Sequence, residues 1–510
     1  MITSLSLLKV NQYHLNILTS WFAIAFGMLI VFFLTPYFIS VFGDYKYGIW
    51  LLINSVIGYV NLAEAGVNIS TGRFVNIHVG KKEYHKASEI LSTSILFFVI
   101  LPCIFVPLIG LLSPSVIDNF LTAGELASDI HSAVILTATT LFVNLIAANI
   151  RLPLNVNHRF DLISLIEVLN TLVRTGLILF FLETKDTQTL TYISLATLIA
   201  ASSTLITSII LSLRFGRKIP ISFKSAKYST FLVIMSFGGW VLLSNIGVMS
   251  INYSDNIVIS YFLGASEIVY FSIGYMLSKY LISILAKISS VKTPKLTQLV
   301  GEQKTNKLAS EYNEMHTMMG VFALPAMIVF FLQLESFINL WMGTKYIGSA
   351  LIGIILTIPF IFSLIMQGIG ATLWAKGIVK TLAITKISIA IANLLISIFL
   401  VRILDDKLLG VALGTALTSL VETTIILPLL AKFKIGIPYL SIIRIHTMFA
   451  LFTCFLYLLL TFLYPYSSDT WSALIINSFV LLAISVLIAK YFFKTFKSKL
   501  ILKILPLDAP

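Results

Sequence analysis

Six charged residues stand out inside the long apolar stretches of this sequence, where charge is rare. They are three cations and three acids: Arg174, Lys279, Lys287, Glu64, Glu167 and Glu422. A charge at the centre of a lipid bilayer costs about 2.5 to 3.5 kcal/mol on insertion scales, so each one that is kept needs a reason. At such depth a lysine or arginine can bind an anion, whereas a carboxylate can bind a coupling proton or neutralise a cation. These six residues are the first candidates for function.

Arg174 lies near the middle of its apolar stretch, about 18 Å deep at 1.5 Å per residue. Glu167 precedes it by seven residues and Asn170 by four, so all three share one face of a helix. One interpretation is a polar stripe along a cavity, in which the arginine binds an anion. The other is a structural link from Arg174 to Glu167 through Asn170, and the sequence leaves both open.

Lys279 also lies near the middle of an apolar stretch, with Tyr275 one helical turn before it and Ser283 one turn after it. A lysine without a partner in its own helix is a poor structural link, so its position favours a role in a cavity. Lys287 lies nearer the end of the same stretch, where its ammonium can reach the membrane surface. Glu64 and Glu422 lie at intermediate depth, where either could bind a proton or neutralise a cation.

The composition explains why these charges are unusual. Of the 510 residues, 58% are hydrophobic and 11% are charged, whereas a typical soluble protein has about 25% charged residues. A soluble fold is excluded, because so few charges cannot cover its surface. Apolar runs long enough to cross a bilayer occur about fourteen times. The sequence therefore predicts an all-α polytopic membrane protein with spans at 18–42, 47–70, 90–112, 130–151, 162–183, 190–213, 229–252, 268–291, 317–341, 350–372, 382–404, 409–430, 446–464 and 471–490.

The basic residues fix the predicted orientation. Of the 35 lysines and arginines, 27 lie in the two tails and the even-numbered loops, and five lie on or beside the odd-numbered loops. Because positively charged loops stay in the cytoplasm, both termini are predicted to be cytoplasmic. The net charge of +13 then reflects orientation and contact with anionic lipid headgroups, and it does not indicate a nucleic-acid partner. The odd-numbered loops carry acids instead: Asp118, Glu125, Asp129, Asp405 and Asp406.

Two further arginines, Arg73 and Arg151, lie at the predicted cytoplasmic ends of spans. Orientation and lipid binding are enough to explain them. An anion that entered from the cytoplasm would nevertheless meet these two side chains first, so both are also candidates for an entry site.

Motifs of known enzymatic sites are missing. Neither the phosphate-binding pattern G-x-x-x-x-G-K-[ST] nor the zinc-binding pattern H-E-x-x-H occurs, so no cofactor and no metal site is expected. No predicted loop exceeds about 25 residues, which leaves no extramembrane platform of the kind that a membrane-embedded transferase needs. The protein is therefore predicted not to be an enzyme.

The chain contains an internal repeat with an offset of 221 residues. Around Gly43 it reads ISVFG and around Gly264 ISYFLG, and the same offset relates SVIDNFL from Ser115 to SFINLWM from Ser336. Several matches at one offset indicate duplication of a six-helix unit. We therefore predict two parallel six-helix lobes, at 1–220 and 221–432, with two extra spans and a basic cytoplasmic tail at 433–510. In transporters built this way the substrate site lies near mid-membrane between the lobes.

Several stretches resemble one known family of transporters. FGDYKYGIWLLINSVIGYVNLAEAG from Phe42, LPLNVNHRFD from Leu152 and YFLGASEIVYFSIGYMLS from Tyr261 resemble the polysaccharide transporters of the multidrug/oligosaccharidyl-lipid/polysaccharide exporter superfamily. The resemblance covers about residues 15–430. It departs from the usual pattern at Glu64, where Asp is more common, and in the two extra spans.

The resemblance implies a Wzx-type O-antigen flippase of the bacterial inner membrane. Its substrate would be an undecaprenyl-pyrophosphate-linked oligosaccharide, moved from the cytoplasmic to the periplasmic leaflet by alternating access through a cationic cavity between the lobes. Membrane lipids and other polysaccharide-assembly membrane proteins are the expected partners. On this interpretation the substrate-binding residues are Arg174, Lys279, Lys287, Arg151 and Arg73, and Glu64, Glu167 and Glu422 are the candidates for ion coupling.

Two alternatives remain open at this point. The first is a drug or metabolite exporter of the same superfamily, which would share the lobes and would have a more acidic cavity. The second is a membrane-embedded sugar transferase, which the absence of a large loop disfavours.

The predicted topology can be tested by cysteine labelling. Single cysteines at Ser222 and Thr122 would lie on opposite sides of the membrane, because the basic residues place the first in the cytoplasm. An impermeant thiol reagent applied to intact spheroplasts should label the cysteine at position 122 and leave the one at 222 unmodified. The reverse result would overturn the topology and the parallel repeat together.

Overall fold

The computed structural model is helical throughout the part of the chain that it describes. That part comprises residues 12–58, 61–120, 124–182, 188–216, 219–290, 292–302, 304–463 and 468–495. The contacts divide the chain into two compact units, residues 1–266 and 267–510. The lobe boundaries at 220 and 432 that the repeat predicts differ from this division and remain a prediction.

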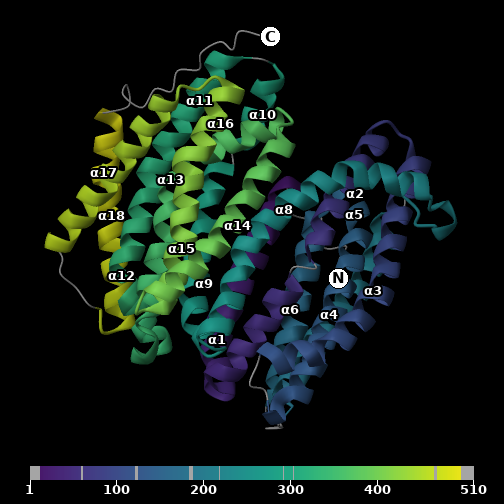
Figure 1. The fold of residues 1–510 in the computed structure, drawn as a ribbon. Helices are drawn as coiled ribbons and strands as arrows, with labels where there is room; N and C mark the ends of the chain where they lie inside the picture. Colours follow the sequence, from purple (N-terminus) through teal and green to yellow (C-terminus); the bar gives the residue numbers. More distant parts are fainter. Residues whose placement is uncertain are drawn as a thin grey trace, which may run out of the picture. The chain divides into compact units, whose positions relative to one another are not determined.

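The N-terminal unit consists of eight α-helices among the described residues, with close packing of α3 on α4, of α4 on α7 and of α2 on α8. Figure 1 labels most of them. Their bounds are α1 (Gln12–Gly58), α2 (Asn61–Gly80), α3 (Tyr84–Phe120), α4 (Ala127–Ile150), α5 (Leu152–Val156), α6 (Phe160–Leu182), α7 (Thr189–Phe215) and α8 (Tyr228–Phe262).

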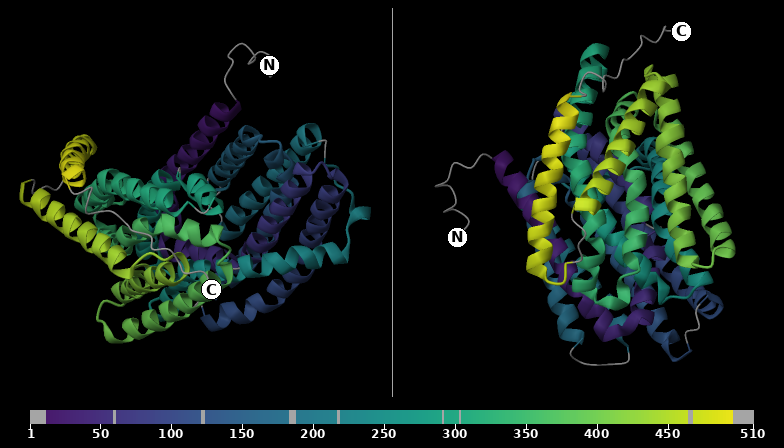
Figure 2. Two further views of the ribbon diagram at one scale, coloured as in Figure 1. Left: turned by 90° about the horizontal axis from the view of Figure 1, so that it is seen from above. Right: turned by 90° about the vertical axis from the view of Figure 1, so that its left-hand side faces the viewer.

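The C-terminal unit is built around α13, which packs on α9 and α15. The last two long helices, α17 and α18, both contact α12, and their aromatic side chains meet where Phe449 and Phe452 pack on Phe493. Helices α17 and α18 have the yellow-green and yellow colours in Figure 2. The helices of this unit are α9 (Glu267–Ser290), α10 (Thr293–Gly301), α11 (Thr305–Met318), α12 (Leu324–Met342), α13 (Ser349–Ala375), α14 (Val379–Ile403), α15 (Lys407–Val421), α16 (Leu427–Ile435), α17 (Tyr439–Leu463) and α18 (Trp471–Thr495).

Twelve of the described helices are long and apolar enough to cross a membrane. The first of them, Leu18–Gly58, contains a break at Gly43, where the backbone leaves the helical conformation (φ 70°, ψ 167°). It therefore covers the predicted first span and residues 47–58 of the predicted second span. Helix α8 coincides with the predicted seventh span and is not one of the twelve. The predicted all-α polytopic class is therefore confirmed. The break in α1 comes at Gly43, and the helix continues through Pro36.

The repeat is visible in the turns. Gly43 and Gly264, the two glycines of the repeated motif, both have positive φ values, 70° and 101°. Two more pairs of residues with positive φ lie at nearly the same separation, 219 residues: Gly124 with Gly343, and His158 with Gly377. Because L side chains seldom adopt this conformation, its recurrence at corresponding turns supports duplication of a helical unit.

Two short π-helical segments interrupt the C-terminal unit, at Met319–Ala323 and Glu422–Ile426. A proline follows each one, Pro325 at the start of α12 and Pro428 at the start of α16. A proline ring clashes with the carbonyl four residues earlier and donates no hydrogen bond, and the wider π-helical turn relieves both problems. Glu422 therefore lies where the sequence forces the helix to widen.

The connection from α7 to α8 is held on the polar face of α3 (Tyr84–Phe120). Ser88 donates to the carbonyl of Pro220, and the hydroxyls of Ser92 and Thr93 accept from the backbone N–H groups of Ser222 (2.9 Å) and Lys227 (3.1 Å). Glu89 forms an ion pair with Lys227 at 2.8 Å and accepts from Thr230. These α3 side chains lie on one helix face and hold the connection that leads into α8.

Glu89→Ala should loosen this connection. The variant loses the contacts of Glu89 with Lys227 and Thr230, and the contact with Lys227 is partly exposed. We therefore expect the free energy of opening this connection to fall by about 1 kcal/mol, so that the open state is populated about fivefold more often. Trypsin cleavage after Lys224 and Lys227 in the purified protein should accelerate accordingly. Glu311→Ala is the matched control, because Glu311 pairs with Lys292 and Lys295 and does not touch this segment. Equal cleavage rates in all three proteins would contradict the proposed contact.

Candidate functional site

Helix α9 presents two different faces. Leu277 and Leu281 line an apolar cavity of about 270 Å³ with residues of α12 and α18, among them Phe330, Phe337 and Leu474. Lys279 lies two residues from each leucine, a rotation of about 200° along the helix, so it points away from this cavity. Its Nζ lies 5.1 Å from the ring centroid of Tyr275, and its side chain is exposed. The lysine is therefore not packed into the protein interior.

A second cation faces the same region of the C-terminal unit. Lys386 of α14 forms an ion pair with Glu422 at 2.5 Å, and the two side chains are 31% and 7% exposed. Lys386 is also close enough to Lys279 to act on it electrostatically. Two ammonium groups and one carboxylate therefore form a charged cluster with an excess of positive charge, built from α9, α14 and the π-helical segment before α16.

The helices behind this cluster are fixed by buried polar contacts. Asn393, seven residues after Lys386 on α14, donates to Thr415 of α15 at 2.8 Å. Ser278, the neighbour of Lys279, donates to the carbonyl of Gly353 on α13 at 2.7 Å. A Cβ on Gly274 would lie 2.4 Å from the carbonyl oxygen of Ser349, so glycine is required for the close approach of α9 and α13. The lysines thus project from a rigid set of helices.

In the N-terminal unit, the predicted polar stripe of α6 is partly resolved. Asn170 donates to the hydroxyl of Thr204 on α7 at 2.7 Å, so this residue faces the interior of the unit. Arg174 is half-buried, and Glu167 is exposed. The contact to Thr204 gives Asn170 a packing role, and the anion-binding role of Arg174 remains a prediction.

The other predicted residues differ in their exposure. Arg73 is exposed on α2, Lys287 is exposed near the end of α9, and Arg151 is half-buried at the end of α4. The side chain of Glu64 lies outside the described residues, as do those of Asp118 and Glu125. Among the residues that the sequence singles out, the structure brings only Lys279 and Glu422 into one described cluster, through Lys386.

One predicted loop acid is structural. Asp129 is 3% exposed, and its carboxylate accepts from the backbone N–H groups of Leu190 at 3.1 Å and Thr191 at 2.8 Å. These donors belong to the first turn of α7, which has no hydrogen-bond partners of its own there. Asp129 therefore caps a neighbouring helix and does not act as a solvated outer-loop charge.

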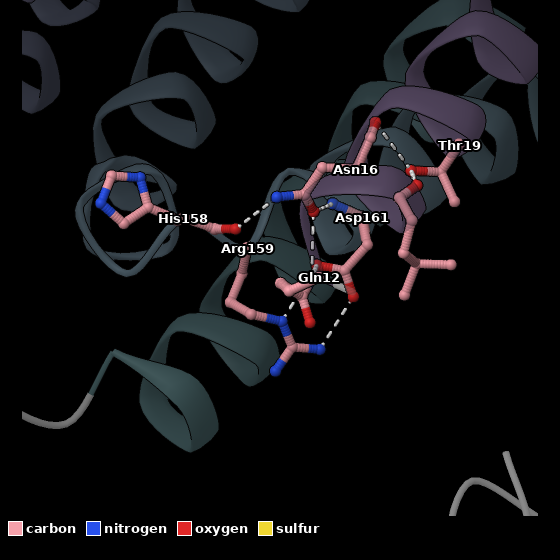
Figure 3. Close-up of polar contacts among 7 residues, drawn as sticks. Gln12, Asn16, Thr19, His158, Arg159 and Asp161 are labelled. Carbon is pink, nitrogen blue, oxygen red and sulfur yellow. Dashed lines mark hydrogen bonds and ion pairs between the residues drawn. The ribbon is translucent and has the colours of Figure 1, made fainter. Parts of the chain in front are cut away.

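The motif LPLNVNHRFD ties the start of α1 to the turn before α6 (Figure 3). Asp161 accepts two hydrogen bonds of 2.9 Å from Arg159, and Gln12 donates to the same carboxylate at 3.0 Å. Asn16 donates to the carbonyl of His158 at 2.8 Å. Hydrogen bonding to Asp161 raises the pKa of the Arg159 guanidinium. The geometry makes this motif a structural junction.

The sequence pattern does not single out Lys386 and Asp255. Lys386 lies four residues after the start of the apolar run 382–404, and it shares a helix face with Asn393. Asp255 lies just beyond the predicted span 229–252, yet it is 1% exposed in α8. A count of charges within four residues of each span end would have found both.

Within the described residues, no group of three or more His, Cys, Asp or Glu side chains could hold a metal ion.

Comparison with known proteins gives consistent results. A family described as "Polysaccharide biosynthesis protein" matches residues 45–351. A Shigella flexneri protein named "Putative O-antigen transporter" is 23% identical over 386 residues, which cover 75% of this chain and 89% of that protein. The "Uncharacterized membrane protein EpsK" of Bacillus subtilis (strain 168) is 22% identical over 427 residues, 82% of this chain and 83% of that protein.

Solved structures share the fold. The lipid II flippase MurJ in an inward closed conformation superposes with a TM-score of 0.71 at 19% identity, over 94% of this chain and 99% of that one. An inward-facing multidrug resistance MATE transporter of the MOP superfamily gives a TM-score of 0.67 at 15% identity, over 79% of this chain and 95% of that one.

The Lys386–Glu422 pair should contribute measurably to stability. Glu422→Ala leaves a partly buried ammonium without its carboxylate, so we expect the free energy of unfolding to fall by about 1 to 3 kcal/mol. The double variant Lys386→Met, Glu422→Leu removes both charges and should recover part of this loss. Thermal unfolding in detergent, followed by tryptophan fluorescence, measures the difference. Asp405→Ala, at an exposed turn, is the control. A double variant less stable than Glu422→Ala would contradict the pairing.

Proposed function

The chain belongs to the family of polysaccharide biosynthesis proteins, and we propose that it is a Wzx-type flippase for a lipid-linked oligosaccharide. It is a multi-pass membrane transporter with the fold of the multidrug/oligosaccharidyl-lipid/polysaccharide superfamily and not an enzyme. The proposed substrate is an undecaprenyl-pyrophosphate-linked O-antigen repeat unit, used in lipopolysaccharide assembly. The proposed location is the bacterial inner membrane, with both termini in the cytoplasm.

The observation that carries this proposal is the pair of lysines inside the spans of the C-terminal unit. A headgroup that contains a diphosphate and sugars is large, polar and anionic, whereas its polyprenyl tail is as apolar as the bilayer. Only the headgroup therefore needs a protected path. Lys279 and Lys386 supply positive charge at membrane depth, and the described cluster contains one acid, Glu422, which pairs with Lys386.

The transport cycle follows from this chemistry. The headgroup binds in a cationic cavity that opens alternately to each side of the membrane, while the tail stays in lipid. Arg174 of the N-terminal unit is proposed to bind the diphosphate together with Lys279. Arg73, Arg151 and Lys287 are proposed to receive it on the cytoplasmic side, and Glu64, Glu167 and Glu422 remain the proposed ion-coupling residues. Membrane lipids and other polysaccharide-assembly proteins are the proposed partners.

A drug or metabolite exporter of the same superfamily is the second candidate, because the fold is equally that of a multidrug transporter. Deletion of the gene separates the two functions. A flippase predicts that lipid-linked repeat units accumulate on the cytoplasmic leaflet and that surface polysaccharide is lost. Unchanged surface polysaccharide with new drug sensitivity would support the exporter.

Charge removal at Lys279 tests the cationic path. Lys279→Ala should abolish restoration of surface polysaccharide in the deletion strain, whereas Lys279→Arg should keep partial activity because it keeps the charge. Arg174→Lys should be the harsher conservative exchange, since an ammonium cannot reproduce two parallel hydrogen bonds to a diphosphate. Protein level is measured in the same membranes, and it should not fall, because removal of a charge lowers the insertion cost.

The competing structural interpretation of Arg174 makes a different forecast. If Arg174 only links to Glu167, adding Glu167→Gln should rescue Arg174→Ala. Full activity of both alanine variants at normal protein levels would refute the cationic path.

A further inference from the structure

We propose that Glu422 is a proton-binding site that anion binding switches on, because the anion and Glu422 compete for the same ammonium of Lys386. This inference rests on the proposed function and deepens it, since it names the group that couples a proton to the bound diphosphate. The cluster of Lys279, Lys386 and Glu422 carries the argument.

The first step is geometric. Glu422 is buried, with 7% of its side chain exposed, and the carboxylate lies 2.5 Å from Lys386 Nζ. It is the first residue of the π-helical segment that Pro428 requires, in a turn wider than the α-helix around it. Lys386 is 31% exposed. The carboxylate of Glu422 is thus enclosed, whereas the ammonium of Lys386 can be reached from outside the packed helices.

The second step is electrostatic. Lys279 and Lys386 repel each other, because both are cations and lie within electrostatic range. Glu422 can neutralise only one of them at a time. An anion with two or more negative charges, such as a diphosphate, satisfies both ammonium groups at once. The bound anion therefore draws Lys386 away from Glu422.

The third step is the effect on Glu422. A carboxylate left buried without its cation is strongly disfavoured. It is neutralised when a proton from water forms an O–H bond with the carboxylate, and no bond of the substrate is broken. When the anion leaves, Lys386 returns, and the proton is released. Binding of one anion is thereby linked to uptake of one proton.

Few titratable groups lie on the surrounding helices. Helix α13, which packs on the π-helical segment, has no titratable side chain between Ser349 and Ala375. Helix α15 carries only Lys407 at its far end, and α16 carries Lys432 and Lys434 in its last turn. On α17, Tyr439 donates to the carbonyl of Thr424 at 3.4 Å, Arg444 is exposed, and His446 is buried with its ring against Phe362 of α13. Tyr275 on α9 lies beside Lys279. Of these groups, Glu422 is the acid that is paired with Lys386, so loss of this ammonium acts on Glu422 directly.

The test uses inorganic pyrophosphate and the purified full-length protein in lipid nanodiscs. Titration calorimetry in buffers of different ionisation enthalpy counts the protons taken up on binding. The wild type should take up about one more proton per pyrophosphate than Glu422→Gln, and the probe's own protonation cancels in this difference. The wild-type affinity should also weaken, by up to about tenfold per pH unit, as the pH rises. Glu422→Gln should lose this additional pH dependence and retain binding.

Two controls separate the possible failures. Glu335→Gln neutralises an exposed acid of α12 and should behave as the wild type. If Glu422→Gln does not fold, Lys386→Gln with Glu422→Gln removes the pair together and should bind more weakly without the extra proton.

The outcomes are distinguishable from failure of the flippase proposal. Binding that requires Lys279 and shows equal proton uptake in the wild type and in Glu422→Gln overturns this inference and leaves the flippase standing. No binding of pyrophosphate to the wild type, with full transport by Lys279→Ala, overturns both.

Discussion

The hydrocarbon core of the bilayer offers no water to pair with polar groups, and every feature of this protein follows from that constraint. Backbone groups must be paired within the segment that crosses, which is why the described chain is built of long helices. Side-chain hydroxyls follow the same rule. Ser194, Thr204 and Thr453 donate to carbonyls of the preceding turn, so even the polar positions of a span need no solvent.

Buried charge meets the constraint in two ways. Asp129 and Asp161 are fully engaged by donors from neighbouring segments and serve as structural junctions. The cluster of the C-terminal unit differs, because it contains two cations and one acid and because the side chain of Lys279 is exposed. Positive charge at membrane depth is costly to insert, and this cost is the reason why we propose a transport role for the cluster.

Departures from regular helix occur at a few glycine and proline positions. Gly43 and Gly264 end the first helix of each repeat with a positive φ, and proline places a π-helical turn at Glu422. Each of these irregularities is encoded locally, by a glycine or by a proline. The recurrence of a positive φ at Gly43 and Gly264 is consistent with the duplication that the sequence predicts.

Composition and periodicity alone determine the membrane class, the approximate spans and the repeat, since the bilayer selects for long apolar helices and each span is a local feature of the chain. They also single out Lys279 and Glu422 as unusual. They do not show that Lys386 joins these residues. Lys279 lies more than 100 residues before Lys386 in the sequence, and the helices that carry Lys279, Lys386 and Glu422 come together only through packing. The capping role of Asp129 is likewise decided by a tertiary contact, with the first turn of α7. Pairing of a charge depends on which helix lies beside it, and no local pattern contains that information.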